Sequence, residues 1–259
     1  MKISNAIKFF IDAFFRKGER SEFAKYISIK KISEALYPKY KFSSFGRIFL
    51  EDSNFVENYK KNVSTLDYSS LDRRYTLDQF VKQALPVAGD TAECGVFNGA
   101  SSLLICNRID GIGKLHHVFD SFEGISAPTA EDAGCAWQRG AFSCSEMRVR
   151  ENLCAYEFVR YYKGWIPERF GEVQDRMFSF VHVDVDLYRP TLDAIAFFYD
   201  RMSPGGIMLC DDYGLIQAPG AKKAMDDFYT DKTEDVICLT TGQGMVIKSS
   251  HGSSTLRLG

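Results

Sequence analysis

Four aspartates follow two apolar runs in the second half of the chain. Asp184 and Asp186 lie in the sequence VHVDVDLY, and Asp211 and Asp212 follow the sequence GGIMLC. Side chains alternate along a strand, so Asp184 and Asp186 should point the same way, about 6.5 to 7 Å apart. Carboxylates that leave buried parallel strands are costly to desolvate unless a cation or substrate meets them. All-oxygen clusters of this kind suit Mg²⁺, Mn²⁺ or Ca²⁺ better than zinc, so the pattern predicts a divalent-metal site.

Not every acid in this cluster need bind the metal. A hydroxyl group has a pKa far above neutrality, so its reaction needs both charge stabilisation and a proton acceptor. A metal can supply the first, and a carboxylate within reach of the hydroxyl can act as the general base. His182 is a rival base, but it lies deeper in the predicted strand, where a core histidine or one that supports a ligand is the favoured interpretation.

A second group of residues predicts a nucleoside-type ligand. The sequence ECGVFNGASS starts at Glu93 and joins a predicted strand to a helix. Gly95 and Gly99 lack side chains where a backbone has to approach a ligand closely. Glu93 can face the amino group of a methionine moiety, and Ser101, Ser102 or helix N–H groups can meet its carboxylate. The alternative is a plain tight turn, and the glycine spacing differs from that of a dinucleotide-binding turn.

The next predicted strand ends in Asp120 and Ser121. Asp120 follows Glu93 by 27 residues, close to the offset of about 20 at which an acid reaches ribose hydroxyls. Such a carboxylate does not distinguish S-adenosylmethionine from NAD, and it can equally cap a helix. Trp165 can stack on adenine or belong to the core.

The elements that must position these residues alternate between strand and helix from Arg73 onward. Alternation of this kind predicts a mainly parallel sheet with helices on both faces, and the last two strands are too close in sequence for a crossover helix. The expected fold is therefore α/β and Rossmann-like, with seven strands that end in an antiparallel hairpin. We predict strands at 91–94, 115–119, 158–162, 178–185, 206–210, 235–239 and 245–248, and helices at 76–85, 100–108, 146–155, 191–201 and 221–229.

Residues 73–248 resemble the macrocin O-methyltransferase family. The resemblance is carried by the sequences RRYTL, ECGVFNGASS, DSFEG, YYKGWIPERF, HVDVDLYRPT, PGGIMLCDDYG and PGAKKAMDDF. It implies a class I methyltransferase fold and transfer of a methyl group from S-adenosylmethionine to a sugar hydroxyl with the help of Mg²⁺ or Mn²⁺. By position, it implies that Asp184, Asp211 and Asp212 bind the metal and that Asp186 is the general base. It also implies that Glu93, Asp120 and Ser121 contact the cofactor.

The N-terminal part differs from the rest in charge and pattern. Residues 1–47 hold 11 basic and 4 acidic side chains, whereas the whole chain has a net charge of −2. Apolar residues recur at helical spacing, which predicts a basic amphipathic helix: Ile3, Ile7, Phe10, Ile11, Phe14 and Phe15. Such a helix can pack on the core, form a homo-oligomer or contact a membrane surface. We therefore predict a helical extension over 1–72, which in the family helps to cover the site and build the oligomer, and a catalytic domain over 73–259.

Charge and cysteine usage indicate which partners and which cellular compartment to expect. The balanced charge does not indicate a nucleic-acid partner. Four of the seven cysteines lie in apolar runs and favour reduced core thiols in a cytoplasmic protein: Cys94, Cys106, Cys210 and Cys238. The expected partner is a small glycosylated acceptor, either a natural product or a surface-glycan precursor, and the segment 125–145 is a candidate substrate loop.

Two other functions remain open at this point. An NAD-dependent short-chain oxidoreductase would share the glycine loop and the ribose acid. Its Tyr-x-x-x-Lys spacing occurs only at Tyr26/Lys30 and Tyr37/Lys41, upstream of the predicted fold. A non-catalytic nucleoside-binding subunit is the second alternative, and the intact acidic quartet argues against it.

Overall fold

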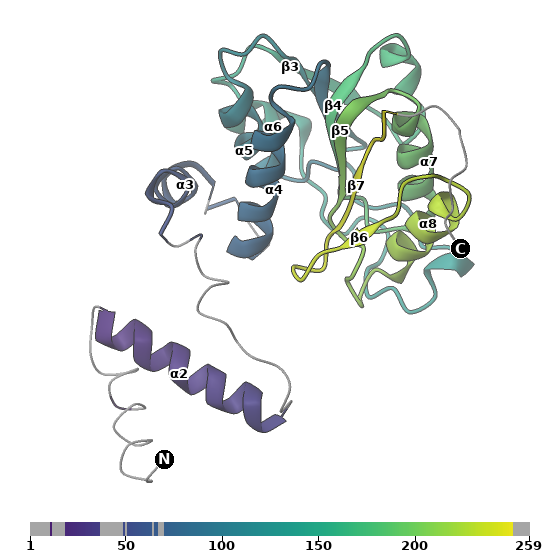
Figure 1. Cartoon of the computed structure of the whole chain (residues 1–259). Helices are drawn as coiled ribbons and strands as arrows, with labels where there is room; N and C mark the ends of the chain where they lie inside the picture. The colour runs from purple at the N-terminus through teal and green to yellow at the C-terminus, as the bar shows by residue number, and fades with distance from the viewer. Residues whose placement is uncertain are drawn as a thin grey trace. The chain divides into compact units, whose positions relative to one another are not determined.

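Seven short runs of mainly apolar residues form the strands of one mixed sheet (Figure 1). The sheet order is β3-β2-β1-β4-β5-β7-β6. Strands β1 to β5 are parallel to one another, whereas β7 is antiparallel to both β5 and β6. This confirms the predicted seven-stranded, mainly parallel sheet with an antiparallel hairpin at its end. The strands are β1 (Asp90–Cys94), β2 (His116–Asp120), β3 (Val159–Lys163), β4 (Phe178–Val183), β5 (Met202–Cys210), β6 (Ile237–Cys238) and β7 (Gly244–Ile247).

Helices cover both faces of this sheet (Figure 1). Helices α4 and α5 pack together over one face, and α7 and α8 pack together over the other. The larger helices of this unit are α4 (Leu71–Ala84), α5 (Ala100–Ile109), α6 (Glu146–Asn152), α7 (Tyr188–Tyr199) and α8 (Pro219–Tyr229). Short helical turns add η2 (Tyr59–Val63), η3 (Ala130–Asp132) and η4 (Phe170–Val173).

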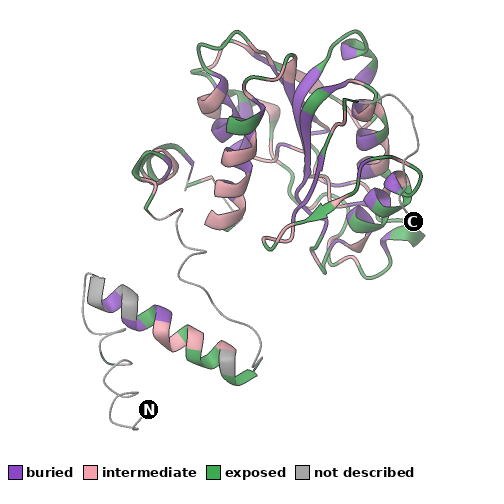
Figure 2. Ribbon diagram, viewed as in Figure 1, coloured by how far each residue is buried: buried purple, intermediate pink, exposed green. Residues whose placement is uncertain are grey.

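The core lies between the central strands and these helices. All six residues of β4 are buried, as expected for a parallel strand that is covered on both faces. Figure 2 shows the buried positions concentrated along the central strands, with exposed positions on the outer loops. Phe178 of β4 packs edge-to-face on Phe198 of α7, with ring centroids 4.9 Å apart.

Two element boundaries differ from the prediction in ways that affect the site. Helix α4 begins at Leu71 rather than at Thr76, which places Arg73 in its first turn. Strand β4 ends at Val183 rather than at residue 185, so Asp184 and Asp186 lie beyond the strand.

The computed structural model describes residues 11, 19–36, 49, 51–63, 65–66 and 70–250. The chain divides into two compact units, residues 1–57 and 58–259. The first contains helix α2 (Glu19–Leu36) and most of α3 (Ser53–Asn58).

Several N-terminal predictions lie outside this description. Of the predicted amphipathic stripe, only Ile11 is described, as an exposed helical residue. The other five positions of the stripe lie outside the described residues. Residues 58–72, which we assigned to the extension, belong to the second unit in this division. The role of the extension in covering the site or in oligomerisation stays a prediction.

Two further features concern membrane-spanning helices and the cysteines. Within the described part of the chain, no helix is both long enough and apolar enough to cross a membrane. All seven cysteines are free, and Cys94, Cys106 and Cys210 are buried as predicted. Cys238 is exposed, because it lies on the two-residue edge strand β6 rather than in the core.

A buried acid connects the C-terminal hairpin to helix α7. The carboxylate of Glu234 accepts hydrogen bonds from the Tyr199 hydroxyl (2.7 Å), from Thr233 Oγ1 (3.0 Å), and from the backbone N–H (3.0 Å) and hydroxyl (2.8 Å) of Ser249. Burial alone would raise the pKa of Glu234, but these bonds outweigh it and lower the pKa from 4.5 to about 2.

We predict that Glu234→Gln lowers the free energy of unfolding at pH 7 by about 1.5 to 3 kcal/mol, because hydrogen bonds to a charged group are lost. Since the folded-state pKa is depressed, this stabilisation is fully present above pH 4.5 and is lost as the pH falls through about 2. Urea unfolding of both proteins at pH 7, 5 and 3 measures the difference. A difference that stays constant down to pH 3 would contradict the assignment.

Candidate functional site

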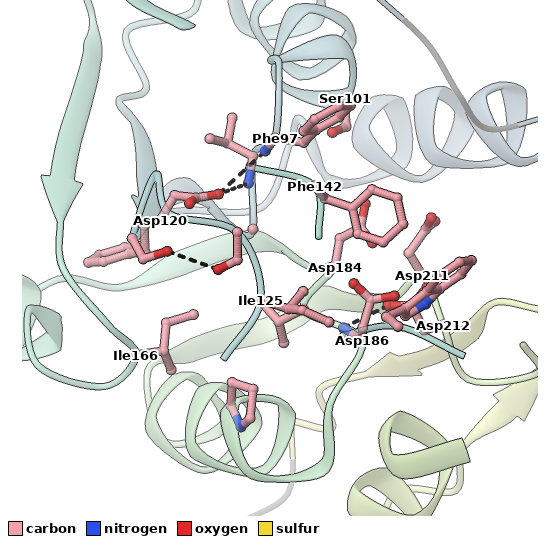
Figure 3. A pocket seen from close by; sticks show the side chains of 18 of the residues that line it. Phe97, Ser101, Asp120, Ile125, Phe142, Ile166, Asp184, Asp186, Asp211 and Asp212 are labelled. Atoms are coloured by element: carbon pink, nitrogen blue, oxygen red, sulfur yellow. Dashed lines mark hydrogen bonds between the residues drawn. The ribbon is translucent and has the colours of Figure 1, made fainter. Parts of the chain in front are cut away.

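A cavity of about 640 Å³ opens at the carboxyl ends of the central strands. Its walls come from the segments that follow each of the strands β1 to β5 and from the start of α4. Figure 3 shows Asp120 on one side of this cavity and a group of four aspartates on the other. The cavity therefore lies at the sheet edge where the sequence predicted both sites.

The structure brings the four predicted aspartates together (Figure 3). Asp184 and Asp186 follow β4, Asp211 and Asp212 follow β5, and all four line the cavity. The backbone N–H of Asp186 donates a hydrogen bond to Asp212 Oδ2 at 3.1 Å, which joins the two segments.

The local geometry differs from the expected strand alternation. Asp186 has a φ angle of 58°, in the left-handed region, and the Leu187 N–H donates to the Val185 carbonyl at 2.5 Å. A tight turn, rather than continued strand, thus directs Asp186 into the cavity. Left-handed backbone in a non-glycine residue costs roughly 1 to 2 kcal/mol and often marks a functional position.

Crowding of like charges shifts the pKa values of these acids. Burial raises the pKa of Asp186 to about 7, and the carboxylate of Asp184 adds to the shift. Burial and neighbouring carboxylates likewise raise the pKa values of Asp184 and Asp212 well above their ordinary value. A carboxyl group with a pKa near neutrality is suited to taking up a proton at physiological pH.

Asp211 behaves differently because it has cationic neighbours. Arg73 of α4 lies 2.8 Å from Asp211 Oδ2 and also donates to the Asp211 carbonyl. Burial alone would raise the pKa of Asp211, but the side chains of His182 and Arg73 outweigh it and hold this pKa well below its ordinary value. Asp211 is therefore ionised across the physiological range.

Two residues of this site had no predicted role. Arg73 lies in a sequence that carried the family resemblance, but no sequence pattern linked its guanidinium group to the aspartates that follow β4 and β5. Gln243, between two glycines of the C-terminal hairpin, is fully buried and donates from Nε2 to Asp211 Oδ1 at 2.7 Å. No periodic signal in the sequence links this turn to the strand ends.

The donor set of this acidic end fits a divalent cation. His182, Asp184 and Asp211 each offer a ligand atom, and these atoms lie within 4.8 Å of one another. The Nε2 atom of His182 is fully buried, and among the described residues it has no hydrogen-bond partner closer than Asp211 Oδ1 at 3.5 Å. Such an orphaned atom beside carboxylates is consistent with a cation site. This group contains Asp184 and Asp211 of the predicted ligand set but not Asp212, and the metal-binding role of the three aspartates stays a prediction.

The opposite end of the cavity is organised by Asp120. Its Oδ2 accepts hydrogen bonds from the backbone N–H groups of Val96 (2.7 Å) and Phe97 (3.4 Å), and its Oδ1 accepts one from Phe122 (2.6 Å). Burial raises the pKa of Asp120 despite these bonds. Asp120 therefore holds the loop after β1 in place while one side of it faces the cavity (Figure 3).

Most of the other predicted cofactor contacts lie around Asp120. Ser101, Ser121 and Trp165 line the cavity, as does Gly95. The Ser121 hydroxyl donates to the Gly124 carbonyl at 3.1 Å, so it also fixes the turn after β2. Gly99 is not among the lining residues.

The backbone around Gly95 and Gly99 requires glycine for reasons other than the predicted close approach to a ligand. A Cβ atom on Gly95 would lie 1.9 Å from the backbone oxygen of Asp184, just beyond the end of the neighbouring strand β4. Gly99 has a φ of 90° at the N-cap of α5, where a Cβ would meet only Leu153 at ordinary distance. The first glycine permits close packing of two strand ends, and the second permits a left-handed turn.

Glu93 lies elsewhere than predicted. It is fully buried and is not among the residues that line the cavity. Its Oε1 is 2.8 Å from His182 Nδ1, and its Oε2 accepts a hydrogen bond from the Ser102 hydroxyl. Both carboxylate oxygens thus have partners inside the protein, because Glu93 points between the sheet and helix α5 rather than into the cavity.

The loop 125–145 contributes an aromatic wall to the cavity, and its role as a substrate loop stays a prediction. Trp137 and Phe142 pack edge-to-face with ring centroids 5.1 Å apart, and Phe142 also packs on Phe97 at 6.0 Å. Phe97 and Phe142 both have left-handed backbone. No motif indicated these positions.

Comparison with known proteins agrees with this geometry. A family model described as "Macrocin-O-methyltransferase (TylF)" matches residues 71–237. The demethyldecarbamoylnovobiocin O-methyltransferase of Streptomyces niveus is 30% identical over 157 residues, which is 55% of this chain and 58% of that protein. The mycinamicin III 3''-O-methyltransferase of Micromonospora griseorubida is 26% identical over 175 residues, 61% of this chain and 68% of that protein. The match therefore spans less than two thirds of the first relative.

Solved structures with the same fold include two methyltransferases. The structure of the O-methyltransferase NovP aligns with a TM-score of 0.61 at 26% identity, over 68% of this chain and 79% of that one. The calicheamicin methyltransferase CalS11 aligns with a TM-score of 0.62 over 92% of this chain and 96% of that one. At 15% identity, the second likeness concerns the fold alone.

We predict that Gly95→Ala destabilises the protein by at least about 2 kcal/mol more than Gly113→Ala does. Both glycines have a φ near 80°, but a Cβ on Gly113 meets nothing within 4 Å. The control therefore bears only backbone strain, whereas the Gly95 variant adds overpacking against Asp184. Urea unfolding at pH 7 compares the two variants, and equal losses would contradict the packing explanation.

Proposed function

The chain belongs to the macrocin O-methyltransferase (TylF) family, and we propose that it transfers a methyl group from S-adenosylmethionine to a hydroxyl of a sugar carried by a small-molecule acceptor. The observation that carries this proposal is the cavity with two chemically different ends. One end has a glycine loop and Asp120, and the other has four aspartates. A nucleoside-type donor at the first end would present its methyl group toward a hydroxyl held at the second.

At the donor end, the chain's residues recognise polar groups of the cofactor. Asp120 is the candidate for the ribose hydroxyls, as in the ribose-binding acids of nucleotide folds. Ser101 at the start of α5 and Ser121 after β2 offer hydroxyl groups, and Trp165 offers an aromatic surface for adenine. S-adenosylmethionine supplies the methyl group as an electrophile bonded to a sulfonium.

At the acidic end, the chain's residues orient the acceptor and remove its proton. Asp184, Asp211 and Asp212 are the proposed ligands of Mg²⁺ or Mn²⁺, which when bound lowers the pKa of an adjacent hydroxyl. Asp186 is the proposed general base, since it lines the cavity beside these three acids and its turn directs it inward. Its uptake of the hydroxyl proton frees the oxygen to attack the methyl carbon, and the bond between that carbon and the sulfonium sulfur breaks, so that S-adenosylhomocysteine leaves.

The acceptors of the relatives support a sugar hydroxyl as the target. Their names specify methylation of demethyldecarbamoylnovobiocin, of a rhamnosylated tetracenomycin C, and of the 3'' position of mycinamicin III. Family membership also favours a methyltransferase over the oxidoreductase and the non-catalytic subunit that the sequence left open. A cytoplasmic location, a homo-oligomer and contact of the basic N-terminal segment with a membrane surface remain parts of this proposal.

We predict methyl transfer that depends on a divalent metal. The test incubates the protein with methyl-labelled S-adenosylmethionine, Mg²⁺ and, separately, each of the three relatives' acceptors. EDTA should reduce the rate by at least about 100-fold, because both the charge stabilisation and the orientation of the hydroxyl are lost. Calorimetric titration should show binding of S-adenosylhomocysteine and none of NAD. Full activity after thorough chelation would remove the metal from the proposal, and binding of NAD alone would overturn the methyltransferase function.

We predict that Asp186→Asn lowers kcat by about 10² to 10⁴-fold, the usual contribution of a general base. Binding of S-adenosylhomocysteine should be unchanged, because Asp186 lies at the other end of the cavity. The matched control is Asp231→Asn, the same change at an exposed acid whose partner is Lys232 on the surface. Normal turnover by the Asp186 variant would refute its assignment as the base.

A further inference from the structure

A polar layer lies directly beneath the acidic end of the cavity. Glu93 of β1 pairs in register with His182 of β4, so the two side chains share one face of the parallel sheet. Asp184 follows His182 by two residues, just beyond the end of β4, and because Val183 pairs with Cys210 the corresponding position just beyond β5 is Asp211. Glu93 and His182 therefore form the layer one step below the two aspartates, on the face covered by α4 and α5.

The lower end of this layer is fully enclosed. Glu93 and His182 both have no exposed surface. Glu93 Oε2 accepts a hydrogen bond from the Ser102 hydroxyl, and Glu93 Oε1 lies 2.8 Å from His182 Nδ1. Ser102 in turn lies 3.1 Å from His116 Nε2. A methyl donor in the cavity therefore meets neither carboxylate oxygen of Glu93.

The upper end of the layer points at Asp211. His182 Nε2 lies 3.5 Å from Asp211 Oδ1 and has no other partner among the described residues. The same carboxylate is held by Gln243 on Oδ1 and by Arg73 on Oδ2. Asp211 is thus contacted on several sides by polar donors, and among them His182 is fully buried and is held by the carboxylate of Glu93 at its other ring nitrogen.

We propose that Glu93 and His182 are positioning residues for the metal-binding carboxylate Asp211, and that Glu93 does not bind the methyl donor. Glu93 fixes the orientation of the imidazole ring, and the ring fixes Asp211 through Nε2. Removal of a residue that orients a metal-binding side chain in this way commonly weakens metal binding by 10 to 100-fold. This inference rests on the proposed function, since it assigns the two residues to the metal half of that site.

Two equilibria measured on the same variants test the inference. Mn²⁺ binding is followed by the loss of the free-ion signal in electron paramagnetic resonance, and S-adenosylhomocysteine binding is followed by calorimetry. Glu93→Gln should weaken Mn²⁺ binding by about tenfold or more and change the Kd for S-adenosylhomocysteine by less than about twofold. The reverse pattern would restore Glu93 to the methyl-donor site and overturn the inference.

Two substitutions of His182 separate its two ends. In His182→Asn the amide reaches the place of Nδ1, so contact with Glu93 is kept while contact with Asp211 is lost. In His182→Gln the amide reaches the place of Nε2 and can still donate to Asp211. The Asn variant should lose about tenfold or more in Mn²⁺ affinity, and the Gln variant should recover part of that loss. Equal losses, or none, would overturn the role through Nε2.

His117→Asn is the matched control. His117 is a buried histidine on the opposite face of the sheet, where it lies 2.9 Å from the Tyr162 hydroxyl and 3.2 Å from Asp90. Its substitution makes the same chemical change at a similar depth and should leave both equilibria unchanged. A comparable loss of Mn²⁺ affinity in this variant would reduce the His182 result to a general loss of stability and overturn the inference.

If the variants do not fold, a measurement on the unmodified chain tests whether His182 responds to metal binding. With ¹⁵N-labelled histidine, Mg²⁺ should shift the ring nitrogen signals of His182 and leave those of His117 in place. No shift at His182 on saturation with Mg²⁺ would overturn the inference. If the unmodified chain binds S-adenosylhomocysteine but no Mn²⁺, the metal half of the proposed function fails as well, so the two failures are distinguishable.

Discussion

Repulsion among four carboxylates at the ends of β4 and β5 is the constraint on which this site depends. Charges this close in a buried setting repel one another strongly, and each also loses hydration. The fold compensates by bringing Arg73 from α4 and His182 from β4 against Asp211, while a turn of the C-terminal hairpin adds Gln243. Three elements that are distant in sequence are thus held together by one acidic centre.

The position of that centre follows from the order of the sheet. The chain runs from β1 outward to β3 and then returns to place β4 on the other side of β1, so the direction of winding changes between β1 and β4. Ligands of open α/β sheets bind where the winding changes, because the loops there diverge and leave a crevice. Asp120 lies on one side of this point and the aspartate quartet on the other.

The sheet and the convergence of the acids were predictable because both depend on short-range patterns. Apolar runs at regular spacing indicated the strands, and parallel strand ends meet at one edge, which placed Asp211 and Asp212 near the acids of β4. The turn at Asp186 was not predictable, since nothing local distinguishes it from continued alternation. Glu93 was predicted to contact the cofactor. The sequence does not reveal the register between β1 and β4, which places Glu93 beside His182 in the interior. Gln243 reaches the site from a hairpin that no sequence pattern connects to it.

The aromatic wall of the cavity comes from a connection rather than from the sheet. Trp137 and Phe142 belong to the loop between β2 and α6, whose two ends are anchored by strand β2 and by the Ser145 cap of α6. Insertions and exchanges in such a surface connection leave the strands undisturbed. Acceptor preference in this architecture can therefore diverge during evolution while the machinery for methyl transfer stays the same.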